Sequence, residues 1–149
     1  MKNRTISSAL ILAAAVFCLT ACTTAFPDDD LDYMWRLDKI SYPGGHDLEG
    51  NIAHEVQVRN VWFCFARNLV EIRDSCAYGY VGVTMEKEGT IQFDYSMYEG
   101  SEDYDADKIL ATLRKCGVAS FVTTFRIDRL SSERLVLSDE NCRLFFTRW

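Results

Sequence analysis

The chain has 149 residues, of which 48% are hydrophobic and 26% are charged, and its formal net charge at pH 7 is −6. This length suits one domain with its own core. An acidic chain repels phosphate backbones, and no basic cluster interleaved with aromatic residues occurs in the sequence, so the composition argues against nucleic acid as a partner.

Residues 1–21 have the organisation of a secretory signal peptide. Lys2 and Arg4 supply a positive start, and residues 9–19 (ALILAAAVFCL) form an apolar middle that is too short to span a bilayer. The small residues Thr20 and Ala21 then precede Cys22. This arrangement predicts that residues 1–21 are removed during export.

Residues 19–22 (LTAC) resemble the lipobox of bacterial lipoproteins. The resemblance implies that the Cys22 thiol receives a diacylglycerol and that cleavage makes Cys22 the first mature residue. Each buried acyl methylene contributes roughly 0.8 kcal/mol, so more than one chain gives a lasting anchor. We therefore expect a lipid-anchored protein of the outer membrane, on its periplasmic or its cell-surface face.

The mature part keeps all 22 acidic residues but only 14 of the 16 basic ones, which gives it a formal charge of −8. We expect this excess to keep the domain soluble and lifted off anionic lipid. Residues 22–33 are polar and acidic with one proline, which is typical of a flexible tether. Residues 34–149 then form the only domain that we predict.

From residue 34 onward, short segments rich in β-formers alternate with turn residues. The most regular alternation lies in residues 90–96, and Val81, Val83 and Met85 share one face of another segment. We predict eight strands, at residues 35–41, 57–66, 69–74, 78–86, 90–96, 120–130, 134–139 and 142–149.

Residues 105–116 change to helical spacing, with Ala106, Ile109, Leu110 and Leu113 on one face and Asp105 suited to the N-cap. One short α-helix is therefore expected between strands five and six. Consecutive antiparallel strands leave two exposed sheet edges, which are removed if the first strand pairs with the last. We predict an all-β fold, an eight-stranded antiparallel up-and-down barrel.

Residues 34–149 resemble the lipocalin-like domains of Bacteroidetes lipoproteins. The resemblance is carried by the opening WRL at residues 35–37 and by FRIDRL, LVL and LFF at residues 125–130, 135–137 and 144–146. It implies a barrel that binds a ligand or a partner, without naming either. The Gly-x-Trp signature of classical lipocalins is missing before Trp35.

Aromatic residues dominate the positions expected to face the barrel interior. An eight-stranded barrel is just wide enough either to be filled by side chains or to hold one small ligand. A cavity lined by rings would accept an apolar or flat molecule. The cavity candidates are Trp35, Phe63 (or Trp62), Phe93, Tyr95, Phe121, Phe125 and Phe146. In the alternative interpretation, these rings pack on one another and leave no room.

Four cysteines follow the anchor: Cys64, Cys76, Cys116 and Cys142. An even number in an exported chain makes disulfides plausible, with three possible pairings. Their spacing matches no zinc template. The alternative is that some are reduced and buried as small hydrophobic residues.

Other polar clusters do not form a recognisable site. His46 and His54 are the only histidines, and Asp103, Asp105 and Asp107 lack the glycine and the glutamate of a calcium loop. No nucleophile motif with a base occurs. We therefore expect no metal, no cofactor, no catalytic residue and no enzymatic activity.

Two functions remain open at this stage. The first is a barrel that binds a small apolar or amphipathic ligand. The second is a filled barrel that serves as an interaction module of an envelope complex, with the acidic, tyrosine-bearing residues 95–104 as its contact surface.

Overall fold

The computed structural model describes residues 31–74 and 79–149. Cys22, the leader 1–21, most of the tether and Cys76 lie outside this range. The elements are β1 (Met34–Ser41), β2 (Glu55–Gln57), β3 (Val61–Ala66), β4 (Leu69–Asp74), β5 (Tyr80–Lys87), β6 (Thr90–Asp94), η2 (Ser96–Tyr98), α2 (Ala106–Lys115), β7 (Val122–Leu130), β8 (Arg134–Ser138) and β9 (Arg143–Arg148). No helix of this part of the chain is long and apolar enough to cross a membrane.

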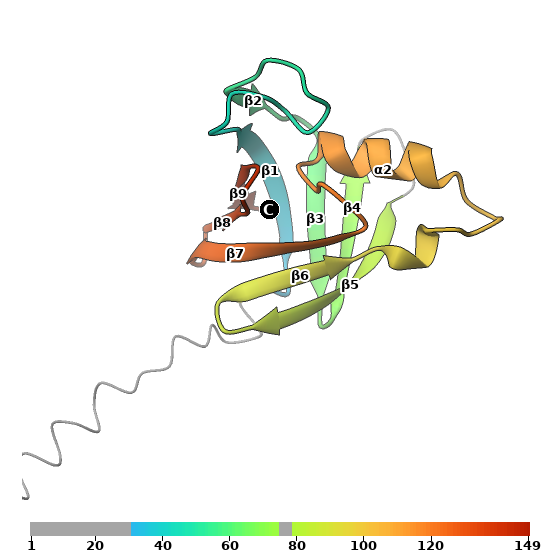
Figure 1. The fold of residues 1–149 in the computed structure, drawn as a ribbon. Coiled ribbons are helices and arrows are strands. Elements are labelled where there is room, and N and C mark those ends of the chain that lie inside the picture. The colour runs from blue at the N-terminus through green and yellow to red at the C-terminus, as the bar shows by residue number, and fades with distance from the viewer. Residues whose placement is uncertain (1–30, 75–78) are drawn as a thin grey trace, which may run out of the picture.

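Successive strands pair antiparallel from β3 to β9, and β1 pairs with β3 on one side and with β9 on the other (Figure 1). The β1–β9 ladder runs from Trp35 opposite Arg148 to Ser41 opposite Arg143. This pairing closes an eight-stranded barrel, which confirms the predicted architecture. The short strand β2 lies outside the ring, on the free part of the β1 edge.

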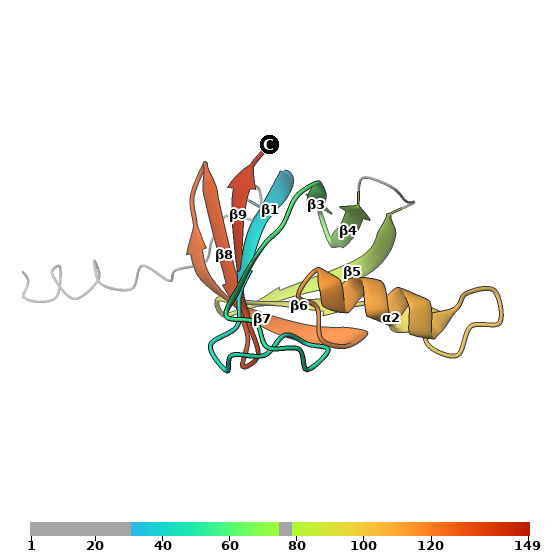
Figure 2. The same ribbon diagram turned by 90° about the horizontal axis from the view of Figure 1, so that it is seen from above.

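The helix α2 lies between β6 and β7, the fifth and sixth strands of the ring, as predicted. Asp105 caps it, because its side chain accepts a hydrogen bond from the Lys108 amide at 3.1 Å. Ile109 and Leu113 are its buried residues. In Figure 2, the helix lies on the opposite side of the barrel from the start of β1 and the C-terminus.

The predicted strand at residues 57–66 is wrong in its bounds, because the chain forms two strands there instead of one. Asn60, between β2 and β3, has φ of 61°, a left-handed conformation that a continuous strand does not contain. The three residues of β2 are all exposed. The deep ladder with β1 and β4 therefore begins only at Val61.

The large apolar side chains of β5 point away from the core and not into it. Val81, Val83 and Met85 share one face, as predicted, but that face is exposed, at 36%, 42% and 58%. The inward positions hold Gly82 and Thr84, both buried. Gly82 leaves room for Tyr95, since a Cβ at this glycine would lie 2.8 Å from the tyrosine ring.

Substituting Gly82 by alanine should therefore destabilise the barrel. The added methyl would meet the Tyr95 ring and the Asp94 carbonyl oxygen, both within 2.9 Å. Overpacking of this kind typically costs about 1–3 kcal/mol. We expect urea denaturation to show a decrease of this size in the free energy of unfolding. Gly44→Ala is the control, because no heavy atom lies within 4 Å of the position of its Cβ. Equal stability of the two variants would contradict this account of Gly82.

Candidate functional site

The barrel interior brings the predicted cavity residues together. Trp35, Phe63, Phe93, Tyr95, Phe125 and Phe146 are each 1% exposed or less, whereas Phe121 is 9% exposed. Their alternate positions on neighbouring strands point them inward. Trp62, the possible substitute for Phe63, instead lies on the outer face, where it packs against Trp149.

These interior rings contact one another. The ring centroids of Phe63 and Phe146 are 4.9 Å apart, and those of Phe93 and Phe125 are 5.2 Å apart. Phe93 also approaches Phe63 at 6.1 Å. These are the distances of direct aromatic packing. The alternative interpretation of a filled interior therefore agrees with the contacts better than a wide apolar cavity does.

Sequence reasoning missed three further aromatic residues of the core, Tyr42, Phe65 and Tyr98. Phe65 is buried and its ring centroid lies 5.8 Å from that of Phe93. Its position two residues after Phe63 was the available signal. Tyr98, on η2, is buried beneath the segment that follows β6, and its hydroxyl accepts a hydrogen bond from the Val81 amide at 3.2 Å.

The Tyr95 hydroxyl is a buried polar group among the rings of this core. Its hydroxyl has no hydrogen-bond partner among the described residues and is shielded from solvent. Burial raises the pKa of the Tyr95 phenol well above its ordinary value, with smaller contributions from Cys116, Tyr98 and Glu71. The phenol is therefore neutral at physiological pH and offers a donor without an acceptor.

Tyr98 also changes the surface expected for residues 95–104. Since Tyr95 and Tyr98 are both buried, the exposed apolar side chains of this segment are Met97 and Tyr104. Tyr104 packs edge-on against Tyr98, with ring centroids 5.0 Å apart. Tyr95 and Tyr98 thus attach this segment to the core, and the segment exposes fewer aromatic side chains than its sequence suggests.

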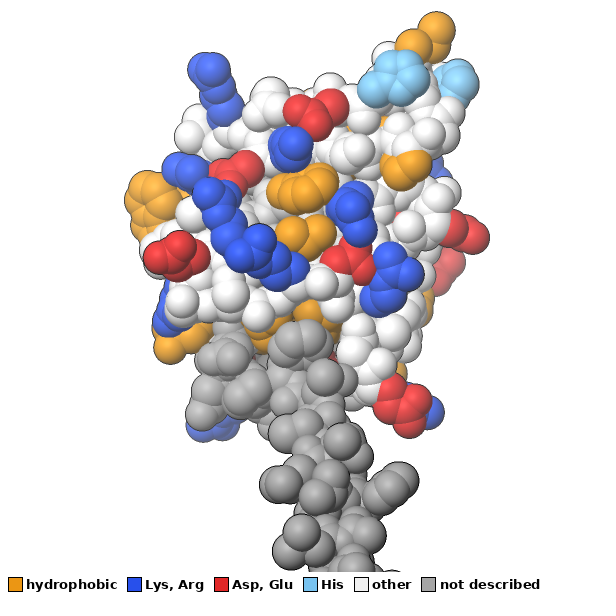
Figure 3. All heavy atoms as spheres, turned by 90° about the vertical axis from the view of Figure 1, so that its left-hand side faces the viewer, with side chains coloured by type: hydrophobic (Ala, Val, Ile, Leu, Met, Phe, Trp, Pro, Cys, Tyr) orange, Lys and Arg blue, Asp and Glu red, His pale blue; other side chains and the backbone are white. Residues whose placement is uncertain are grey.

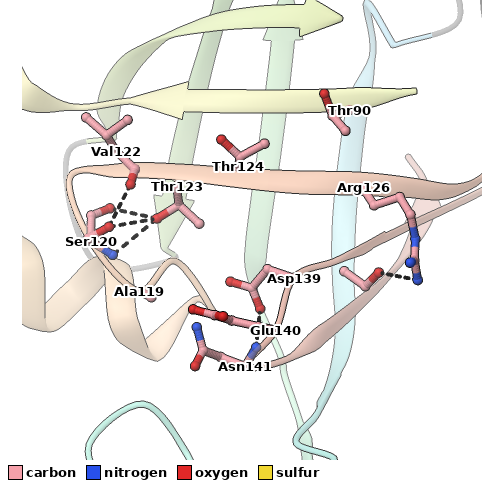
Figure 4. Close-up of a pocket in the computed structure, with 11 residues that line it drawn as sticks. Thr90, Ala119, Ser120, Val122, Thr123, Thr124, Arg126, Asp139, Glu140 and Asn141 are labelled. Carbon is pink, nitrogen blue, oxygen red and sulfur yellow. Dashed lines mark hydrogen bonds between the residues drawn. The ribbon is translucent and has the colours of Figure 1, made fainter. Parts of the chain in front are cut away.

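Three clefts lie around the turn between β8 and β9. The largest has a volume of about 630 Å³ and lies between the start of β7 and this turn (Figure 4). Two neighbouring clefts, of about 490 Å³ and 240 Å³, each share residues of the same turn. Such volumes fall near the range of ligand sites, but these clefts are open and lie outside the barrel.

The lining of the largest cleft is mostly polar, and much of it is already hydrogen bonded. The Thr123 hydroxyl donates to the Ser120 carbonyl at 3.0 Å, and Asp139 accepts from the amides of Asn141 and Cys142 at 2.8 Å. Arg126 reaches Ser138 at 3.3 Å. These bonds hold in shape the loops that line the cleft.

The three described cysteines, Cys64, Cys116 and Cys142, are free thiols, which does not support the expected disulfides. Cys76, the fourth candidate, lies outside the described residues. The Cys142 thiol donates to the Gly117 carbonyl at 3.3 Å. Burial, with a smaller effect of Asp74, raises the pKa of Cys116 to about 12, and burial, with a smaller effect of Asp139, also raises the pKa of Cys142.

His46 and His54 make different contacts in the same turn region. The Nδ1 atom of His46 lies 3.2 Å from the Gly44 carbonyl oxygen. The ring of His54 instead packs close to Gly45. In the described ranges, no group of three or more His, Cys, Asp or Glu side chains could hold a metal ion.

The outer face of β1, β9, β8 and β7 carries an unusual concentration of cations. These four strands contain seven basic residues and only two carboxylates, Asp38 and Asp128. In Figure 3 this side of the molecule shows hydrophobic side chains surrounded by Lys and Arg. We refer to it as the basic face, formed by Arg36, Lys39, Arg126, Arg129, Arg134 and Arg143 around Val136 and Phe145.

Strand register explains how the basic face is built. Arg129, Val136, Phe145 and Lys39 pair in turn across the four strands and form one row. The Lys39 ammonium lies 4.7 Å from the centroid of the Phe145 ring. A second row runs from Arg126 through Ser138 and Arg143 to Ser41, and a third from Arg134 through Thr147 to Arg36.

Each carboxylate of this face holds two arginines. Asp128 accepts from Arg126 at 2.5 Å and from Arg143 at 2.8 Å, and Asp38 pairs with Arg36 and Arg134. Burial alone would raise the pKa of Asp128, but hydrogen bonds from Arg126, Ser138 and Arg143 hold it below its ordinary value. Six cations of this face stand against these two carboxylates, so the face keeps a positive excess.

A family model described as a lipocalin-like domain matches residues 17–149. The chain belongs to this family of lipocalin-like domains. Two solved structures share the fold: a lipocalin-like protein from Bacteroides uniformis ATCC 8492 (TM-score 0.57, 19% identity) and an uncharacterized protein from Bacteroides eggerthii DSM 20697 (TM-score 0.59, 16% identity). Each match covers 80% of this chain and 99% of the other. No curated protein matches the sequence.

The buried thiols of this lipocalin-like domain should be unreactive in the folded protein. At pH 8, Cys116 and Cys142 are protonated, because burial raises both thiol pKa values far above that pH. We expect iodoacetamide to modify these two residues only after denaturation, as measured by mass spectrometry of their peptides. The denatured chain is the control. Recovery of a disulfide-linked peptide, or rapid native modification, would contradict the free buried state.

Proposed function

We propose that this chain is a lipoprotein, anchored in the outer membrane through Cys22, whose lipocalin-like barrel is a packed scaffold for binding at its outer surface. The single observation behind the scaffold is the mutual contact of interior rings, with Phe63 and Phe146 only 4.9 Å apart. A core packed in this way stabilises the barrel but offers little space to a guest.

Binding would then take place on the outside of the barrel. The clefts around the β8–β9 turn and the basic face both lie there. We propose a non-enzymatic role, with an envelope component as the partner. The sequence of residues 1–22 supports the cellular location, since it combines a secretory leader with a lipobox.

An apolar or amphipathic ligand inside the barrel is the second candidate. The unpartnered Tyr95 hydroxyl favours it, because a buried donor without an acceptor is costly and a bound guest could supply one. Tyr95 lies next to Phe93 on the chain and faces the same core. The two candidates therefore differ in whether the folded protein retains a small molecule.

Replacing Cys22 by serine should release the protein from membranes. The hydroxyl of serine cannot take the place of the thiol in lipidation, so we expect the variant to move from the membrane fraction to the soluble envelope fraction. Cys64→Ser is the matched control and should stay with the membrane. If the Cys22→Ser protein stays membrane-bound in the same amount, the proposed anchor is wrong.

Native mass spectrometry of the protein purified from its own host should detect the polypeptide and its lipid modification alone. Denaturing spectra of the same sample provide the reference mass, so any difference reports a non-covalent guest. A stoichiometric adduct that is lost on denaturation would instead support the apolar-ligand candidate, and its mass would identify the class of ligand.

A further inference from the structure

The two ends of the described domain meet at one edge of the barrel. The Trp149 amide donates to the Met34 carbonyl at 2.9 Å. Tyr33, Met34 and Trp149 are 41%, 37% and 68% exposed, although each is a large apolar residue. Beside them lies Trp62, whose ring meets that of Trp149 edge-on at 6.0 Å. We refer to Tyr33, Met34, Trp62 and Trp149 as the aromatic edge.

Two arginines lie against the rings of this aromatic edge. The Arg148 guanidinium carbon is 3.1 Å from the centroid of the Tyr33 ring, and that of Arg36 is 6.0 Å from a Trp149 ring. Arg36 also belongs to the basic face, so the two surfaces are continuous. The aromatic edge thus combines exposed indole and phenol rings with cations.

The tether limits how far this edge can lie from the anchor. Eight residues, 23–30, separate Cys22 from Leu31, the first described residue. An extended chain spans at most about 3.3–3.6 Å per residue, so the tether reaches about 30 Å. If Cys22 is lipidated, the aromatic edge is the part of the domain that is tied nearest to the bilayer along the chain.

We propose that the aromatic edge and the adjoining basic face dock on the anionic phospholipid interface of the membrane that holds Cys22. This inference rests on the proposed lipid anchor. Trp and Tyr side chains favour the interface because one part of the ring is apolar and the other is polar. Arginines beside them attract lipid phosphates, and the charge of these strands is opposite to that of the chain as a whole.

A membrane explains this combination better than an acidic protein does. An acidic partner would require the cations but not the exposed Trp149 indole beside the point where the tether begins. The anchor also raises the local concentration of lipid around this edge, so even weak contacts would orient the barrel. Docking in this way leaves α2, on the opposite side, facing away from the membrane (Figure 2).

The test uses the mature lipidated protein reconstituted in phosphatidylcholine vesicles with phosphatidylglycerol, in which some acyl chains carry bromine. Bromine quenches tryptophan fluorescence on contact. Trp35 is fully buried, so quenching should arise at the aromatic edge and fall at least two-fold in Trp149→Phe. Quenching that is equal in wild type and Trp149→Phe would overturn the proposal.

Charge variants test the role of the arginines. Arg36→Glu with Arg148→Glu should reduce quenching at least two-fold, and more strongly in vesicles with phosphatidylglycerol than without it. Lys108→Glu with Lys115→Glu changes the charge equally on α2, the far side of the barrel, and should leave quenching unchanged. Circular dichroism checks that each variant folds. Equal quenching in the arginine variant and in the α2 variant would contradict the role proposed for Arg36 and Arg148.

The Cys22→Ser protein separates failure of this surface from failure of the anchor. Because docking belongs to the domain, the unanchored protein should still be quenched at high concentrations of anionic vesicles, and this quenching should disappear in high salt. An absence of lipid on Cys22 with retained quenching would refute only the anchor. An absence of quenching in both the anchored and the unanchored protein would refute the docking surface.

Discussion

The ladder between β1 and β9 is the constraint on which the rest of the structure depends. It satisfies the edges of the two strands at the ends of the meander, which would otherwise remain open to other chains. It also decides which surfaces become neighbours. The rows of the basic face cross this ladder, and the aromatic edge forms where it ends at Trp35 and Arg148. The β1–β9 pairing therefore both closes the barrel and brings together the residues of the candidate surface.

The interior and exterior of the barrel divide the functional possibilities. The interior rings contact each other and so contribute to stability and shape, which is why the proposed function assigns binding to the outward residues. Net charge gives a misleading picture of that exterior. The chain is acidic overall, yet strand register collects seven of its cations on four neighbouring strands. An expectation based on total charge, that the domain is lifted off anionic lipid, overlooks this distribution.

Much of the barrel could be predicted from the sequence because alternation and turn residues are local signals. The strand β6 and the helix with its Asp105 cap follow from such signals, although β6 ends at Asp94 and not at the predicted residue 96. The break at Asn60 could not be predicted in this way, since it depends on a single backbone conformation. The outward face of β5 depends on a neighbour: Tyr95 occupies the inner space, which leaves room only for Gly82. The basic face likewise requires register between strands far apart in the sequence.

The separation of β1 from β9 along the chain also decides when the barrel can close. More than a hundred residues lie between the two strands that close the ring, so this contact cannot form until nearly the whole domain is available. If the chain is exported leader first, as proposed above, it would cross the membrane before the β1–β9 ladder can form. The long-range pairing that stabilises the finished barrel would then also delay closure of the ring until after export.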